Sequence, residues 1–220
     1  MKLIKTFGLI TGLALLGQTN ATEAKSWLYT GIGIGVTSAK ADLSYKTLGH
    51  SSDLVKVGGE GPNYGVFLGY HYAIQESPLF VRAEIGAQHH NLSFIQDEKI
   101  HGVHIKSHTY LKTNNSLVYK LKGGVLIKDL MIHGSFGVAN TNWRMSLSFE
   151  GGTSKGASEK FDRIGSLFGF GIDYKINPNW MVGMEHTFTE YKELKMQIDR
   201  CDFKMKPKIQ VTNFRLTYVF

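Results

Sequence analysis

The sequence has 220 residues, of which 25 are Gly and 4 are Pro, with 12% aromatic residues and a formal net charge of +7. This length predicts one domain. Mean hydropathy is -0.14, and beyond the amino terminus no run approaches the ~20 apolar residues of a spanning helix, which excludes a helical membrane protein. The positive charge forms no basic motif interleaved with aromatic residues, so we expect no nucleic-acid partner.

Residues 1–21 have the layout of a secretory signal peptide. A basic start at Lys2 and Lys5 precedes an apolar centre from Phe7 to Leu16, and a small-residue cleavage site ends at Ala21. We expect cleavage after Ala21, with Ala24 as the alternative, which leaves residues 22–220 as the exported domain. The single cysteine, Cys201, has no partner for an internal disulfide.

After the predicted signal peptide, large apolar side chains begin to alternate with small or polar ones at a period of two residues. Leu28–Val36 places large apolar residues on one face and Tyr29 with three glycines on the other. This pattern predicts a strand whose glycine face lines the inside of a narrow barrel. The same alternation recurs in Tyr64–Tyr72 and Leu79–Ala87, with a short turn near residues 75–78 between them.

Further segments alternate in the same way: Leu117–Ile127, Leu130–Val138, Ser166–Tyr174, Trp180–Phe188 and Lys208–Phe220. Lys128-Asp129 and Asn177-Pro178-Asn179 supply tight turns. After Val138 the large residues change phase, as Trp143 shows, which predicts a bulge or a hairpin that extends above the membrane.

The last segment places Phe214, Leu216, Tyr218 and Phe220 on one face and Arg215 on the other. An apolar outer face and a polar inner face are typical of transmembrane barrels. The links also alternate between short ones, near residues 75, 128 and 178, and long ones at 37–62, 89–115, 140–163 and 189–207, which a soluble sandwich would not require. The predicted fold is an all-β, eight-stranded, antiparallel up-and-down transmembrane β-barrel.

Where faces are assigned, which in the last segment begins at Thr212, the charged residues all fall on the inward face: Arg82, Glu84, Lys120, Lys122, Asp173, Glu185 and Arg215. On the lipid face, a Lys or Arg at mid-bilayer would cost ~2 to 4 kcal/mol. Because little water fits inside eight strands, we expect these groups to pair in an internal network. Its expected role is structural, with an ion path as the alternative.

A family likeness rests on three features of the sequence. They are the stretch GFGIDYKINPNWMVGMEHTF, with Gly169, Gly171, Tyr174, Trp180 and Glu185, the motif NTNW at 140–143, and the terminal Phe220. From about Leu28 to Phe220 the chain resembles the eight-stranded opacity-type surface antigens, relatives of the membrane domain of outer-membrane protein A that are often labelled porin-family proteins.

The resemblance implies a location in the outer membrane of Gram-negative bacteria and surface loops that touch host or environment. It also implies insertion by the outer-membrane assembly machinery, which would read the terminal aromatic strand through Phe214, Leu216, Tyr218 and Phe220. Because the sequence ends at Phe220, the peptidoglycan-binding module of two-domain relatives is not expected.

Two predicted loops carry groups that are candidates for binding. Residues 89–115 hold His89, His90, His101, His104 and His108, which offer imidazoles to a transition metal or a response to pH. No cysteine lies nearby and the spacing fits no known ligand set, so a solvated loop is favoured. The last link and its flanks carry six cations suited either to lipopolysaccharide phosphates or to a mixed solvated surface: Lys192, Lys195, Arg200, Lys204, Lys206 and Lys208.

A catalytic group is a further alternative. If strands pair through the 177–179 turn, we expect Ser166 and His186 to be diagonal neighbours on the lipid face, with Glu190 one step further out, in the order of a nucleophile, base and orienting group. The strand motifs of lipid A deacylases and palmitoyltransferases are not evident, so we expect no enzymatic activity, cofactor or metal.

The sequence therefore predicts a monomeric surface antigen or adhesin-like protein that acts through four external loops and supports envelope integrity. Its expected partners are outer-membrane lipid and lipopolysaccharide, the assembly machinery and a host surface ligand. A narrow channel for small solutes and a lipid-modifying enzyme remain the alternatives.

Overall fold

The computed structural model describes residues 26–47, 50–51, 55–99, 106–150, 157–198 and 201–220. The predicted signal peptide at 1–21 lies outside these ranges, so its boundaries stay a prediction. Among the described residues, no helix is long and apolar enough to cross a membrane.

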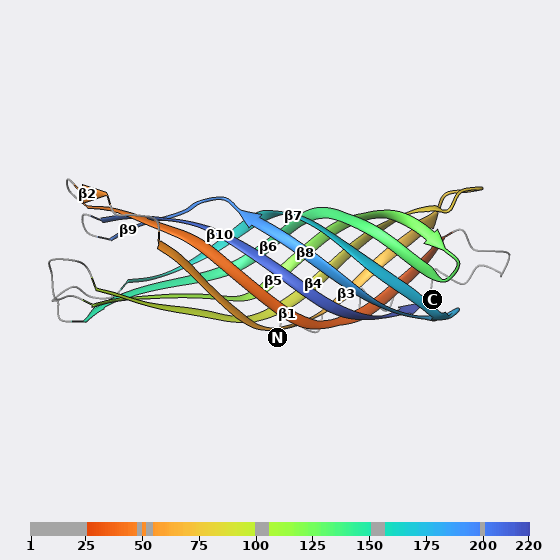
Figure 1. Cartoon of the computed structure of the whole chain (residues 1–220), viewed down its shortest axis with the longest axis horizontal. Coiled ribbons are helices and arrows are strands. Elements are labelled where there is room, and N and C mark those ends of the chain that lie inside the picture. Colours follow the sequence, from red (N-terminus) through yellow and green to blue (C-terminus); the bar gives the residue numbers. More distant parts are fainter. Residues whose placement is uncertain (1–25, 48–49, 52–54, 100–105, 151–156, 199–200) are drawn as a thin grey trace, which may run out of the picture.

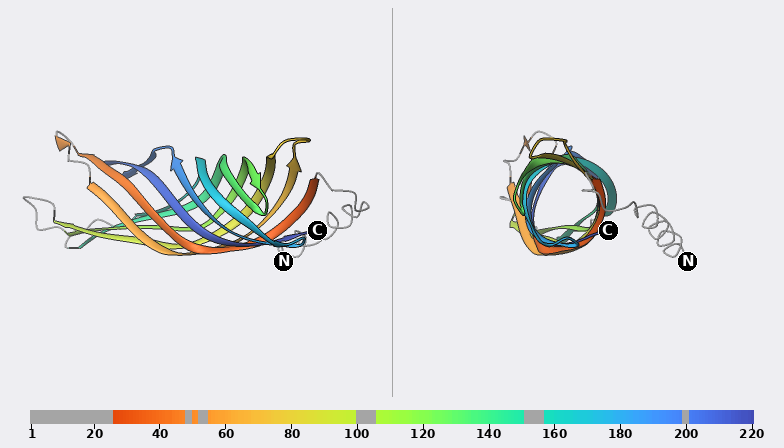
Figure 2. Two further views of the ribbon diagram at one scale, coloured as in Figure 1. Left: turned by 45° about the vertical axis from the view of Figure 1, so that its right-hand side comes forward. Right: turned by 90° about the vertical axis from the view of Figure 1, so that its right-hand side faces the viewer.

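Eight long antiparallel strands close into a barrel (Figures 1 and 2). They are β1 (Ser26–Thr47), β3 (Val55–Ala73), β4 (Leu79–Lys99), β5 (Lys106–Ile127), β6 (Leu130–Glu150), β7 (Ala157–Asn177), β8 (Trp180–Tyr191) and β10 (Cys201–Val219). Two short strands, β2 (His50–Ser51) and β9 (Leu194–Ile198), pair with the far ends of β1 and β10. Each long strand pairs with the next, and β1 pairs with β10 to complete the ring. The predicted fold class is confirmed.

Side chains alternate between lumen and exterior as predicted. On β1, Tyr29 is fully buried, whereas Ile32 and Ile34 are 53% and 62% exposed. On β7 the exterior face from Ile164 to Ile176 is apolar except for Ser166. This segment rises about 30 Å for a strand tilted by about 40° and so matches a hydrocarbon core. Exposed aromatic residues form a girdle at the turn end of this band: Tyr72, Tyr174, Trp180 and Phe220.

The short turns also agree with the prediction. Lys128 and Asp129 alone separate the paired residues Ile127 and Leu130, and Lys128 adopts a φ of 55°, the left-handed conformation that a two-residue hairpin turn requires. At the next turn, Asn177 Oδ1 accepts hydrogen bonds from the backbone N–H groups of Asn179 and Trp180.

The prediction of long loops was wrong in extent, because most of these residues continue the strands. β4 runs to Lys99 and β5 begins at Lys106, so all described residues of 89–115 belong to strands. Most of 37–62, 140–163 and 189–207 is likewise strand. Backbone pairing continues past the lipid, where the outer face no longer needs to be apolar, and the alternation of hydrophobicity therefore fades before the strand ends. Figure 1 shows these hairpins projecting from one end of the barrel.

The phase change after Val138 is not a bulge in β6. Ala139, Thr141 and Trp143 are all buried and continue one pleat, and the β6–β7 register is unbroken from Leu130 to Leu147. Large residues move from the exterior to the lumen because the strand leaves the lipid there. The register shifts lie instead in β4, between His89 and Leu92, and in β5, between Thr113 and Ser116.

Candidate functional site

The lumen is filled by successive layers of side chains. At the turn end, an apolar cluster crosses the barrel, formed by Tyr29, Phe67, Phe80, Met131, Met181 and Val219. Further toward the hairpin end lie the charged residues, and beyond them a smaller apolar cluster of Val118, Ala139 and Leu167. The inward alternation of eight strands positions all of these groups.

The first charged layer is the ion pair between Arg82 and Asp173. Arg82 Nη1 lies 2.6 Å from Asp173 Oδ2, and Arg82 Nε donates a hydrogen bond of 2.9 Å to His71 Nδ1. His71 stacks on Trp27 with ring centroids 3.7 Å apart, and His133 Nε2 lies 3.4 Å from Asp173 Oδ2. Strands β1, β3, β4, β6 and β7 are thereby joined across the lumen.

The second charged layer contains two carboxylates that share three cations. Lys120 Nζ lies 2.9 Å from Glu84 Oε1 and 2.7 Å from Glu185 Oε2. Lys122 Nζ lies 3.0 Å from one oxygen of each carboxylate. The Arg215 guanidinium also contacts both carboxylates: Nη1 lies 3.1 Å from Glu84 Oε1 and also contacts Glu185 Oε2. The same guanidinium lies 3.8 Å from the centroid of the Phe67 ring.

All seven residues predicted to face inward are thus brought together in these two layers, and each is at most 5% exposed. A cavity of about 20 Å³ adjoins Glu84, Lys120, Glu185 and Arg215. A space of this size holds about one water molecule. All three carboxylates are therefore paired with the four cations, which leaves a formal charge of +1 in the two layers, in an interior where an unpaired charge would be costly.

A chain of hydrogen bonds that the sequence reasoning missed crosses the lumen toward the hairpin end. His90 joins Thr37 Oγ1 through Nδ1 at 2.9 Å and Ser116 Oγ through Nε2 at 3.0 Å. Ser116 Oγ lies 2.6 Å from Thr141 Oγ1, which lies 2.6 Å from Tyr191 Oη. Thr37, His90, Thr141 and Tyr191 lie in segments predicted to be loops, and Ser116 lies between the predicted loop 89–115 and the predicted strand that begins at Leu117. Only their inward parity would have revealed them.

The predicted histidine cluster does not assemble among the residues that are described. His90 points into the lumen, whereas His89 lies on the outer wall, where its Nδ1 is 2.7 Å from Asn115 Oδ1. His101, His104 and the side chain of His108 lie outside the described part of the chain. Within that part, no group of three or more His, Cys, Asp or Glu side chains is placed to hold a metal ion.

The predicted catalytic arrangement of Ser166, His186 and Glu190 is wrong. Ser166 pairs directly with Glu190, and the pair Phe168–Phe188 separates them from His186. His186 Nδ1 instead contacts Thr212 Oγ1 at 2.7 Å. The three side chains therefore do not form a nucleophile–base contact.

The basic residues near the last hairpin form a mixed surface. Lys208 Nζ lies 2.8 Å from Glu190 Oε1, and Lys195 Nζ lies 3.7 Å from Glu193 Oε1. Arg200 lies outside the described residues, as does the side chain of Cys201. On β10 the predicted assembly residues Phe214, Leu216, Tyr218 and Phe220 all lie on the exterior face; their role in assembly stays a prediction.

A closed antiparallel barrel with an apolar outer band, an aromatic girdle and a lumen filled with paired charges has the architecture of an outer-membrane β-barrel. The sequence matches the family described as "Outer membrane protein beta-barrel domain" over residues 9–220. The chain belongs to this family and is a protein of the bacterial outer membrane.

Solved structures with a similar backbone include the outer membrane protein OprG from Pseudomonas aeruginosa, at 14% identity and a TM-score of 0.49, covering 89% of this chain and 97% of that one. The outer membrane protease OmpT from Escherichia coli matches at 9% identity and a TM-score of 0.47, covering 92% of this chain and 99% of that one. No curated protein matches the sequence.

Proposed function

We propose that the protein is a non-conducting outer-membrane barrel that presents its long hairpins at the bacterial surface, as a surface antigen or adhesin-like protein that also supports the envelope. It acts as a monomer, without catalysis or cofactor, and its partners are the assembly machinery, outer-membrane lipid and a host surface ligand bound by the hairpins.

The observation that supports this proposal is the filled lumen. Glu84 and Glu185 are neutralised by Lys120, Lys122 and Arg215 at contact distance, so the charges are committed to one another rather than to a passing ion. Apolar clusters lie on both sides of them. A narrow channel for solutes would need a continuous wet path, whereas the cavity beside the carboxylates has room for about one water molecule.

The hairpins supply the surface for recognition. β4 and β5 stay paired from Leu92 opposite Thr113 to Lys99 opposite Lys106, beyond the bulges at the end of the barrel. Pairing holds the backbone of this hairpin in one conformation, which favours binding because little backbone entropy is lost on contact.

Planar-bilayer conductance of the refolded protein tests the closed lumen. We expect no current steps from the parent protein or from Glu185→Gln and Arg82→Gln variants, because the other buried groups still fill the lumen. Reproducible steps whose size changes in either variant would overturn the proposal in favour of the narrow channel.

Surface recognition is tested by shortening one hairpin. Deleting residues 94–99 together with 106–111 removes equal lengths from paired positions of β4 and β5 and leaves the barrel register unchanged. Bacteria that display the shortened protein should adhere less to host cells than bacteria with the parent. A matched trimming of 145–147 with 157–159, which pair with one another, reports which hairpin matters. Adhesion unchanged by both deletions would contradict the adhesin-like role.

A further inference from the structure

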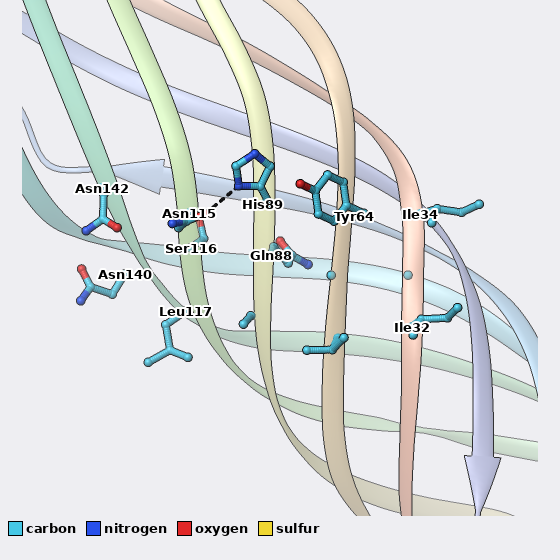
Figure 3. Close-up of a pocket in the computed structure, with 14 residues that line it drawn as sticks. Ile32, Ile34, Tyr64, Gln88, His89, Asn115, Ser116, Leu117, Asn140 and Asn142 are labelled. Carbon is cyan, nitrogen blue, oxygen red and sulfur yellow. Dashed lines mark hydrogen bonds between the residues drawn. The ribbon is translucent and has the colours of Figure 1, made fainter. Parts of the chain in front are cut away.

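A groove of about 650 Å³ runs along the outer wall across β1, β3, β4, β5 and β6 (Figure 3). Its middle is shallow because the outward side chain there is the small Ala87 of β4. Larger apolar residues, among them Ile32 and Leu117, flank it on the membrane side. The width and apolar lining suit an acyl chain lying against the barrel.

The hairpin side of the same groove is lined by amides and an imidazole. His89, Asn115, Asn140 and Asn142 point outward there, and the His89–Asn115 contact of 2.7 Å fixes two of them (Figure 3). Amide groups on a lipid-facing wall are costly unless they find hydrogen-bond partners. Their position directly beyond Leu117 on β5 and Val138 on β6 matches the depth at which a lipid changes from acyl chain to polar headgroup.

Beyond the amides, three cations stand opposite one another on adjacent strands. Lys112 on β5 pairs with Arg144 on β6, which pairs with Lys160 on β7. All three point outward, because their neighbours Thr113, Trp143 and Phe161 are buried in the lumen. Like charges directly opposite each other across a sheet are destabilising by themselves.

Asp162 lies two residues from Lys160 on β7 and is hydrogen-bonded to Asn142. Among the described side chains, no ion pair involves Arg144 or Lys160. A row of three cations on adjacent strands gains stability from an external anion, and phosphate oxygens are well suited to Arg and Lys donors.

We propose that this wall binds one phosphorylated, acylated glycolipid of the outer leaflet, the chemistry of lipopolysaccharide, with its acyl chain in the groove, its sugar and amide groups on the Asn layer and its phosphates on Lys112, Arg144 and Lys160. Strand β6 places the three chemistries in the order that the lipid requires, because its outward residues run from Val138 through Asn140 and Asn142 to Arg144.

The exterior lysines of β10 fit this occupant less well. Lys208 is committed to Glu190 at 2.8 Å, and Lys206 stands opposite Asp42 on β1. Acidic neighbours repel phosphate, so the wall around β5, β6 and β7 is favoured over the cationic stretch that sequence alone pointed to.

Native mass spectrometry of the refolded protein in detergent tests the site, with lipid A carrying both phosphates as the probe and enzymatically dephosphorylated lipid A as its match. For the parent protein we expect one tightly bound lipid A, weaker binding of the dephosphorylated lipid and no competition by millimolar inorganic phosphate. Arg144→Gln/Lys160→Gln should weaken lipid A binding about 10- to 30-fold, since each surface cation near an anionic headgroup contributes about one factor of five.

Lys204→Gln/Lys206→Gln is the control, because it removes the same charge from exposed positions on the opposite wall; its affinity should stay within twofold of the parent. Ala87→Phe fills the groove and should weaken both lipids, whereas Ala83→Phe, on the same strand and face, should not. Equal binding of the two lipids by the parent, equal losses in the two double variants, or full competition by inorganic phosphate would each overturn the proposal.

Discussion

Arg82 Nη1 and Asp173 Oδ2 lie 2.6 Å apart inside the barrel, although their strands, β4 and β7, are not neighbours in the sheet. The pair therefore ties two separate walls together, and both side chains are at most 2% exposed. In such surroundings the desolvation cost of each charge is offset only by its partner.

Breaking this pair should destabilise the barrel. Asp173→Asn and Arg82→Gln, each alone, should lower the free energy of unfolding by about 3–5 kcal/mol, because each leaves an uncompensated buried charge. The double variant should lose less than the sum of the two single losses. Urea unfolding of the refolded protein in micelles, followed by tryptophan fluorescence, measures all three.

The matched control is the exposed pair Lys208–Glu190, whose side chains are 46% and 49% exposed. Its double-mutant cycle should show no measurable coupling, because water screens both charges. A coupling inside the lumen as small as that on the surface would show that Arg82 and Asp173 do not depend on each other.

Gly69 faces the ring of Tyr29 so closely that an added Cβ would overlap it. Gly69→Ala should therefore destabilise the protein by about 1–3 kcal/mol through overpacking of the turn-end cluster. Gly123→Ala is the control, since nothing lies within 4 Å of its added Cβ. Urea midpoints that fall equally in both variants would mean that backbone freedom, rather than the tyrosine, requires glycine at position 69.

Within the lipid band, the sequence predicted which residues face inward because alternate side chains of each strand face the lipid and must be apolar, whereas polar side chains must face the lumen. A charged side chain such as that of Arg82 or Glu185 is too costly to place against the lipid, so it must point into the lumen. Above the lipid this constraint ends, so Trp143 enters the lumen with no change in pleat. Of the two predicted explanations for the phase change, a bulge or a hairpin that extends above the membrane, the unbroken β6–β7 register agrees with the second. The strands beyond the bilayer, with the chain of hydrogen bonds from Thr37 to Tyr191, were missed for the same reason.

Register was the second limit. Residue spacing does not fix which residues of β7 and β8 stand opposite each other, and the structure pairs Ser166 with Glu190. Ser166 and His186 do lie on the exterior, but they stand too far apart for the predicted contact. The cation row across β5, β6 and β7 also depends on the register shift between Thr113 and Ser116 in β5, which no residue spacing reveals.

Ser116 holds together the chain of hydrogen bonds near the hairpin end. Ser116→Ala leaves His90 Nε2 and the Thr141 hydroxyl each short of a buried partner, and we expect a loss of about 1–3 kcal/mol in unfolding free energy. Ser166→Ala, on the exterior of β7, should leave stability unchanged. If lipid A from cells that express the Ser166→Ala variant also keeps its parental mass spectrum, the result agrees with a non-enzymatic barrel.

Phe220 closes the exterior aromatic face of β10, where its ring meets Tyr218 edge to face with centroids 5.2 Å apart. If the terminal aromatic strand is read by the assembly machinery, Phe220→Ala should reduce the amount of protein inserted into the outer membrane of living cells while refolding into detergent micelles stays as efficient as for the parent. Phe170→Ala, which removes a similarly exposed ring from β7, separates recognition from the loss of lipid contact and should insert normally. Equal insertion of the two variants, or a refolding yield that falls in parallel with insertion for Phe220→Ala, would show that the ring contributes to the barrel itself rather than to recognition by the machinery.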